Sequence, residues 1–196
     1  ASYPMAGLAT LTEVREALEN FKASGKWIVS YNEVISQKGY FISSVADEIY
    51  LYPQGGMDLR GFNSSVMFYK GLMDKLGVEM QVIRGKNNKF KSAVEPFLYS
   101  EMSPANREQV EKYLGSLWES VAKRISKSKG ISVEELNALA DGFEINSAED
   151  AVENKLIDAT LYADEVETLL MEKVDVSSAD DLKLVSLKKY NKTSPL

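Results

Sequence analysis

The side chains that could carry acid–base or nucleophilic chemistry are few in kind, because the sequence contains no histidine and no cysteine. A Ser-His-Asp triad, a Cys-His pair and a metal site with histidine or thiolate ligands are therefore excluded for this chain alone. Acid–base catalysis would have to use lysine, aspartate, glutamate or tyrosine. We predict no metal site and no cofactor.

Lys91 is the first candidate, as a general base. It lies in the run Phe-Lys-Ser-Ala-Val-Glu-Pro-Phe (residues 90–97), which supplies apolar neighbours. Burial among such neighbours destabilises an ammonium group and favours the neutral amine that a base requires. The alternative is a solvated lysine that, in a helical segment, forms a surface ion pair with Glu95. The pattern alone leaves both interpretations open.

Ser36 is a second candidate, as a nucleophile close to Gly39. A serine nucleophile needs a neighbouring base and backbone N–H groups for the oxyanion, which a glycine at a strand-to-helix turn can supply. Helix caps and turns explain this serine, and Ser43 and Ser44, equally well. Gly55 and Gly56 lack the lysine and hydroxyl residues of a phosphate loop, so a tight turn is the better interpretation there.

Composition narrows the class of protein. The chain has 196 residues, of which 44% are hydrophobic, and a formal net charge of -6 with acids and bases interspersed, so it is expected to be globular and not to bind nucleic acid. No apolar run reaches the length of a membrane span, and the first residues lack the pattern of a signal peptide. We expect that any targeting or anchoring segment was removed or never present.

The order of elements predicts an α/β fold. Serine caps predict helix N-termini at Ser103, where Pro104 takes the first helical position, and at Ser132 and Ser147, where an acidic residue follows three residues later. Helical spacing predicts a further helix over residues 64–76, closed by Gly77. Apolar or alternating runs predict strands over residues 27–31, 48–52, 78–83 and 182–187. Repeated strands and helices of this length point to layered α/β structure.

Residues 90–97 resemble the lysine motif of the S49 peptidases, the signal peptide peptidase A or protease IV group. The resemblance is to the first of the two tandem domains of that family, and it covers roughly residues 1–165. Further stretches agree with the family in order and spacing, namely residues 39–49, 53–55, 61–62, 69–78 and 102–104.

The resemblance implies a serine endopeptidase with a Ser-Lys dyad that degrades cleaved signal peptides. Lys91 is then the base, and Ser92 and Glu95 are candidates for orienting it. Where the nucleophile-bearing repeat has Ala-Ser-Gly-Gly-Tyr, this chain has a segment one residue longer, 35–40, without glycine next to Ser36. The nucleophilic serine is therefore expected from a C-terminal half, and this chain alone is expected to be incomplete and inactive.

The resemblance also implies an architecture and partners. The expected fold is ClpP/crotonase-like, with stacked β-β-α units and additional helices. Residues 1–175 would form the N-terminal repeat, with its preceding strand missing, and residues 176–196 a strand and linker towards the C-terminal half. Peptide substrates, a homo-oligomer of four tandem subunits and the periplasmic face of a bacterial inner membrane are expected, with the membrane anchor outside this chain.

Two alternatives remain open. The repeat could be a non-catalytic structural or assembly module of the same peptidase, with Lys91 inert. The ClpP/crotonase fold could instead serve acyl-CoA chemistry, although no signal of a nucleotide pocket is recognisable in the sequence.

Overall fold

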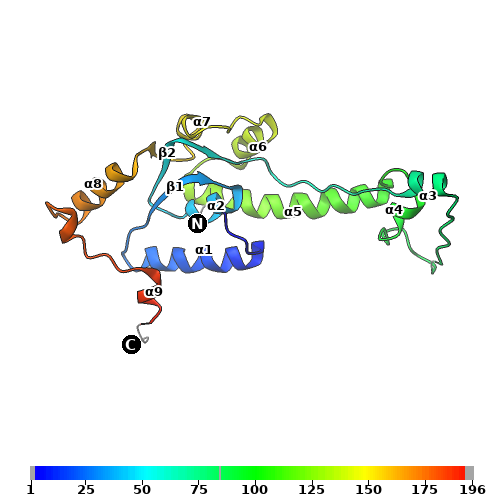
Figure 1. The fold of residues 1–196 in the computed structure, drawn as a ribbon, viewed down its shortest axis with the longest axis horizontal. Helices are drawn as coiled ribbons and strands as arrows, with labels where there is room; N and C mark the ends of the chain where they lie inside the picture. The colour runs from blue at the N-terminus through cyan, green and yellow to red at the C-terminus, as the bar shows by residue number, and fades with distance from the viewer. Residues whose placement is uncertain (1–2, 84, 193–196) are drawn as a thin grey trace. The chain divides into compact units, whose positions relative to one another are not determined.

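A parallel sheet organises the first part of the chain. Its strands β1 (Val29–Ile35), β2 (Glu48–Met57) and β3 (Ala159–Thr160) lie in the order β1-β2-β3, and both pairings are parallel. The computed structural model describes residues 3–83 and 85–192, and these form two units. The sheet belongs to unit 1, which comprises Ala1–Asp58 and Ile145–Leu196 (Figure 1).

Helices cover the sheet within unit 1. Helix α2 (Gln37–Ser43) packs on β1 and β2, α1 (Leu8–Ala23) packs on α2, and α7 (Ala148–Glu153) packs on β2. In Figure 1, α1 lies below the strands and α7 above them. The remaining helices follow β3, namely α8 (Ala163–Lys173), the 3₁₀ helix η1 (Ala179–Asp181) and α9 (Leu187–Tyr190). The apolar core includes Ile35, Tyr40, Phe41, Ile49, Leu51 and Leu156.

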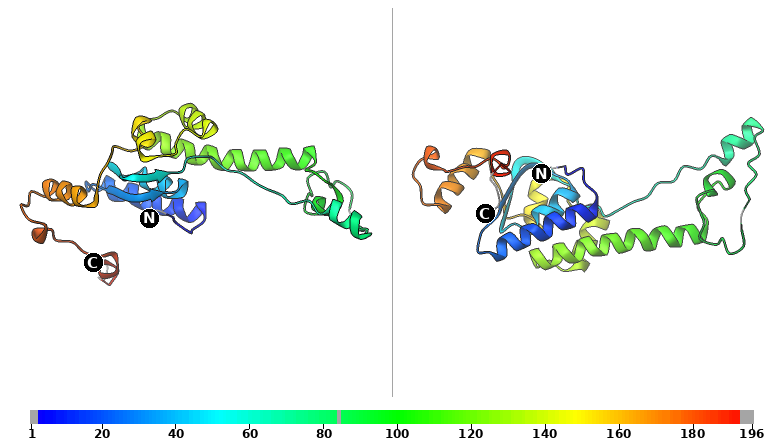
Figure 2. Two further views of the ribbon diagram at one scale, coloured as in Figure 1. Left: turned by 45° about the horizontal axis from the view of Figure 1, so that its top comes forward. Right: turned by 90° about the horizontal axis from the view of Figure 1, so that it is seen from below.

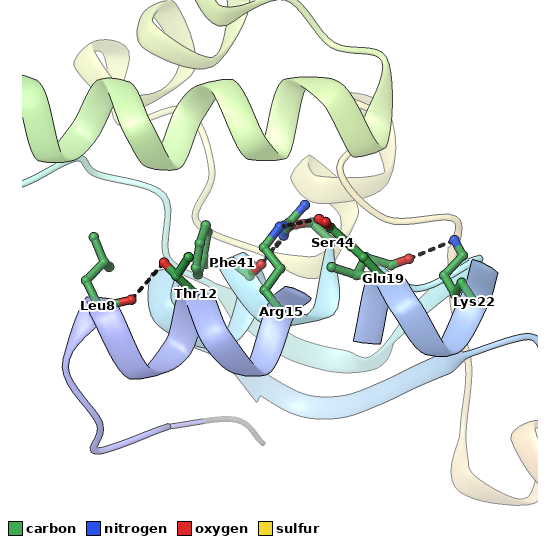
Figure 3. Close-up of polar contacts among 8 residues, drawn as sticks. Leu8, Thr12, Arg15, Glu19, Lys22, Phe41 and Ser44 are labelled. Carbon is green, nitrogen blue, oxygen red and sulfur yellow. Dashed lines mark hydrogen bonds and ion pairs between the residues drawn. The ribbon is translucent and has the colours of Figure 1, made fainter. Parts of the chain in front are cut away.

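A buried arginine joins α1 to α2. Arg15 is 0% exposed, and its guanidinium donates to the Phe41 carbonyl oxygen and, at 2.7 Å, to the Ser44 hydroxyl (Figure 3). The same group lies 5.0 Å from the centre of the Phe41 ring and donates to Glu19 at 3.1 Å. Because these carbonyl and hydroxyl acceptors lie at the C-terminal end of α2, the cation also faces the negative end of the helix dipole.

Strand β2 bulges opposite Glu33. Asn32 pairs with Leu51, but Val34 pairs with Gly56, so residues 52–55 of β2 stand opposite Glu33 alone. A β-carbon on Gly55 would lie 2.0 Å from the Glu33 carbonyl oxygen, and glycine is therefore required there. The predicted turn at Gly55 and Gly56 is wrong, because the strand continues through both residues.

Unit 2, Leu59–Glu144, is helical. Helix α5 (Pro104–Lys129) packs on α6 (Val133–Gly142), and α3 (Lys70–Leu76) packs on α4 (Glu95–Leu98). Figure 2 shows α3 and α4 near the N-terminal end of α5. The Trp118 indole donates to Asn137 at 2.7 Å, which links α5 to α6. The buried side chains of α5 and α6 include Val121, Ala122, Ile125, Leu136 and Leu139.

The predicted α/β class is confirmed, and several elements are too. Ser103, Ser132 and Ser147 are the N-caps of α5, α6 and α7, as predicted. The strands predicted over 27–31 and 48–52 exist as β1 (Val29–Ile35) and β2 (Glu48–Met57). The helix predicted over 64–76 begins only at Lys70.

Two predicted strands are wrong. Residues 78–83 form no strand, and Ile83 is fully exposed, because no neighbouring strand in the described residues pairs with them. Residues 182–186 are likewise irregular, and α9 begins at Leu187. Alternation of apolar residues therefore did not indicate a half-buried strand in either place.

The predicted boundary at residue 175 stays a prediction. Residues 193–196 of the predicted linker lie outside the described part of the chain. Among the helices that the structure describes, none has both the length and the apolar character needed to cross a bilayer.

Candidate active site

Lys91 lies in unit 2, between two hydrogen-bonded turns. Its backbone N–H donates to the Asn88 carbonyl at 2.9 Å, and the Ser92 carbonyl accepts from the Glu95 N–H at 2.9 Å. The second turn leads directly into α4, which begins at Glu95. The backbone around Lys91 is therefore fixed on both sides, although the residue lies outside any helix or strand.

The Lys91 side chain is exposed, so its apolar neighbours along the sequence do not bury it in this chain. Its ammonium group forms no hydrogen bond or ion pair with the residues that the structure describes. Phe90 and Phe97 are themselves 48% and 37% exposed, so they do not enclose it. An exposed lysine is solvated, and a base role requires another surface to exclude water from it.

Glu95 is the buried carboxylate of this region, at 3% exposure. It accepts hydrogen bonds from the Ser103 hydroxyl at 2.7 Å, the Ser103 N–H at 3.2 Å and the Asn106 amide at 3.1 Å. No contact between Glu95 and the Lys91 ammonium is present in the described chain, so the surface ion pair considered for them does not form. Glu95 instead fastens α4 to the first turn of α5.

Ser92 and Ser36 are placed differently. Ser92 is half-buried and takes part in the turn through its carbonyl oxygen. Ser36 lies in unit 1 as the N-cap of α2, where its hydroxyl accepts from the Gly39 N–H at 3.2 Å. This is the cap interpretation of the serine, and its hydroxyl has a structural use. Lys91, Ser92 and Glu95 thus share one segment, and Ser36 belongs to the other unit.

The buried tyrosines of unit 1 serve the core. The Tyr40 hydroxyl donates to the Leu156 carbonyl at 2.8 Å, and burial raises the pKa of this hydroxyl well above its usual range. Burial, followed by the hydrogen bond to Glu48, raises the pKa of Tyr50 to about 12. Both hydroxyls stay protonated near neutral pH, which does not suit a general base.

Ser103 and Asn106 are the residues of this site that sequence reasoning missed. Ser103 was predicted as a helix cap, but its contact with Glu95, eight residues earlier, was not. A signal was present in the third position of α5, where Asn106 replaces the acidic residue found at the same position of α6 and α7. An N-terminus without its own acidic residue needs an acceptor from elsewhere.

Comparison with known proteins gives consistent results. The model of "Peptidase family S49" matches residues 20–177. "Protease 4" of Salmonella typhi is 35% identical over 190 residues, which cover 93% of this chain and 30% of that protein. "Protease 4" of Haemophilus influenzae is 34% identical over 64% of this chain and 20% of its own length. "Serine protease SPPA, chloroplastic" of Arabidopsis thaliana is 30% identical over 94% of this chain and 27% of its own length. The chain therefore spans less than a third of each of these relatives.

Proposed function

Because the chain belongs to peptidase family S49, we propose that it is the lysine-bearing half of a serine peptidase, with Lys91 as the general base. The Lys91 amine takes the proton of a serine hydroxyl from another part of the protein. The serine oxygen then attacks the peptide carbonyl and forms an acyl-enzyme, the amine leaving with that proton, and water hydrolyses the ester. Cleaved signal peptides are the proposed substrates.

The observation that carries this proposal is the placement of Lys91. Its side chain is exposed and without a polar partner among the described residues, while its backbone is fixed by turns on both sides. A lysine presented in this way can be covered by a second surface, which would remove its water and bring the serine to it. The greater length of the relatives supports such a surface in the rest of the protein.

The other members of the site have smaller proposed roles. Glu95 would position Lys91 through the turn that its N–H forms with the Ser92 carbonyl, since its carboxylate is occupied by Ser103 and Asn106. Ser92, next to Lys91, would hydrogen-bond the amine once the site is covered. Ser36 remains the weaker candidate nucleophile, because it caps α2.

The test is Lys91→Ala in the full-length protein, with Lys89→Ala as the matched control. Lys89 is an exposed lysine of the same segment, and its ammonium lies 4.9 Å from the centre of the Phe90 ring. We expect Lys91→Ala to lower kcat for a quenched fluorescent signal peptide by roughly 10²–10⁴-fold, which is the usual contribution of a general base. Lys89→Ala should stay within about twofold of wild type, because a surface cation contributes little.

A structural or assembly role is the second candidate. It is favoured by the exposed apolar side chains of α3 and α4, among them Leu72, Leu76 and Phe97, which suit a covered interface. Full peptidase activity of Lys91→Ala, with normal size on a sizing column, would support this role and refute the base assignment.

The proposed setting follows the resemblance to the family. We place the full-length protein at the periplasmic face of a bacterial inner membrane, anchored by a segment outside this chain, as a homo-oligomer of four tandem subunits. Crosslinking and membrane fractionation of the full-length protein test both points.

A further inference from the structure

The N-terminus of α5 differs from those of α6 and α7 in where its acceptor comes from. In α6, the Glu135 carboxylate accepts from the N–H of the cap residue Ser132 at 2.9 Å. In α7, Asp150 accepts from the N–H of Ser147 at 2.9 Å. Both acceptors belong to the helix that they cap. In α5 the acceptor for the Ser103 N–H is Glu95, which belongs to α4.

Glu95 is held by the first turn of α5 through both of its oxygens. Oε1 accepts from the Ser103 hydroxyl, while Oε2 accepts from the Ser103 N–H and from the Asn106 amide. Glu95 and Asn106 are buried, at 3% and 7% exposure, so water competes little for these bonds. The carboxylate also faces the positive end of the dipole of a 26-residue helix.

This attachment is continuous with the backbone of Lys91. The Glu95 N–H donates to the Ser92 carbonyl, and the preceding turn is closed by the Lys91 N–H on Asn88. A shift of Glu95 would therefore move the turn that follows Lys91. Displacement of a reacting group by about 1 Å can lower a rate by roughly 10²-fold.

We propose that Ser103 and Asn106 are positioning residues for Lys91, acting through Glu95 and the turn at Ser92. This inference rests on the proposed role of Lys91 as the base. Neither Ser103 nor Asn106 touches the substrate in this scheme. Their hydrogen bonds to Glu95 attach the turn next to Lys91 to the N-terminal end of α5 and so fix the position of Lys91 relative to the serine.

The test compares two serine caps of unit 2 in the full-length protein. Ser103→Ala and Ser132→Ala each remove an N-cap hydroxyl, from α5 and α6 respectively, and only the first contacts Glu95. We expect Ser103→Ala to lower kcat for a quenched fluorescent signal peptide about tenfold, with KM changed less than about twofold. Ser132→Ala should lower the melting temperature to a similar extent and leave kcat within about twofold of wild type.

Two further variants separate positioning from loss of folding. Ser103→Thr keeps the hydroxyl and should restore kcat. Asn106→Ala leaves the Ser103 cap in place and removes one bond to Glu95, so it should lower kcat about threefold even if Ser103→Ala does not fold.

The outcomes distinguish this inference from the function on which it rests. Equal kcat values for Ser103→Ala, Asn106→Ala and Ser132→Ala, in an enzyme that Lys91→Ala inactivates, would overturn the positioning role and leave the base assignment intact. An active Lys91→Ala enzyme would overturn both. A selective loss of kcat in Ser103→Ala and Asn106→Ala, reversed by Ser103→Thr, would support it.

Discussion

At the scale of single residues, Arg15 shows how a buried cation can be tolerated. The side chain is 0% exposed, yet its guanidinium reaches the Phe41 carbonyl, the Ser44 hydroxyl and the Glu19 carboxylate (Figure 3). A buried charge without such partners would be strongly unfavourable. The planar guanidinium serves several acceptors at once and stacks on the Phe41 ring, which a lysine ammonium could not reproduce.

We therefore predict that Arg15→Met destabilises unit 1. Methionine fills much of the same space but leaves the buried Phe41 carbonyl and Ser44 hydroxyl without this donor. The free energy of unfolding should fall by about 2–4 kcal/mol, measured by urea denaturation.

The control is Glu19→Gln, since the Glu19 side chain is 41% exposed. Glu19→Gln should lower the free energy of unfolding by no more than about 1 kcal/mol. Glu19→Gln could instead lower the free energy of unfolding as much as Arg15→Met does. The Arg15–Glu19 ion pair within α1, and not the contacts of Arg15 with α2, would then account for the stabilisation.

The candidate site was only partly predictable at this scale. The motif around Lys91 indicated the residue, but the sequence left open whether its apolar neighbours bury it. The side chain is exposed, and Phe90 and Phe97 are themselves 48% and 37% exposed. Composition of a segment does not give the direction of its side chains. The contacts of Glu95 were also out of reach, since Ser103 meets it through tertiary structure and not through helical spacing.

At the scale of elements, Asp47 ties the end of α1 to the start of the sheet. Its carboxylate accepts from the Ile28 N–H at 2.8 Å and from the Lys22 ammonium at 2.9 Å. The Ile28 N–H, and after it Lys22, hold the pKa of the Asp47 carboxyl below its usual value. Folding thus favours the ionised form of this group.

We predict a pH-dependent effect of Asp47→Asn. Because the pKa of Asp47 is lower in the folded chain, its contribution is fully present above the unfolded pKa and is lost as the pH falls through the folded value. At pH 7 the substitution should cost about 1 kcal/mol, a figure kept small because the side chain is 41% exposed. At pH values below the folded pKa of Asp47, wild type and variant should converge in stability.

Urea denaturation at several pH values measures this difference. Asp74→Asn is the comparison, because it removes an exposed ion pair within α3 and should cost at most about 0.5 kcal/mol. A difference for Asp47→Asn that is constant from pH 7 to pH 3 would show that its ionisation has no part in stability.

Elements differed in how far local sequence determined them. The caps of α5, α6 and α7 were predictable because each serine hydroxyl accepts from the backbone N–H of the residue three positions later. The strands expected at 78–83 and 182–187 were not, because a strand exists only where another strand offers its backbone. Strand β2 extends beyond the expected stop at Pro53, because Val34 and Ile35 of β1 pair with Gly56 and Met57 after the bulge.

At the scale of the whole molecule, the exposed Lys91 leads to a prediction about the isolated chain. The 196-residue polypeptide should show less than about 1% of the peptidase activity of the full-length protein, because the Lys91 side chain is exposed to water. Turnover of a quenched fluorescent signal peptide at equal molar concentration measures this, with circular dichroism to confirm the helices.

Activity of the isolated chain would be informative if it appeared. Loss of that activity on Ser36→Ala, but not on Ser43→Ala, would identify Ser36 as the nucleophile and contradict the supply of the serine by another part of the protein. Ser36 caps the N-terminus of α2 and Ser43 is its last residue, so the control removes a serine hydroxyl from the same helix.

Backbone crowding at Gly55 limits how far sequences of this fold can diverge. The space beside this residue is occupied by the carbonyl oxygen of Glu33, so even one methyl group would not fit without moving a strand. A descendant of this sequence could lose the glycine only together with the bulge, through a deletion that restores regular pairing of β1 and β2. In an alignment of distant homologues, a gap in this stretch and a larger residue at this position should therefore occur together.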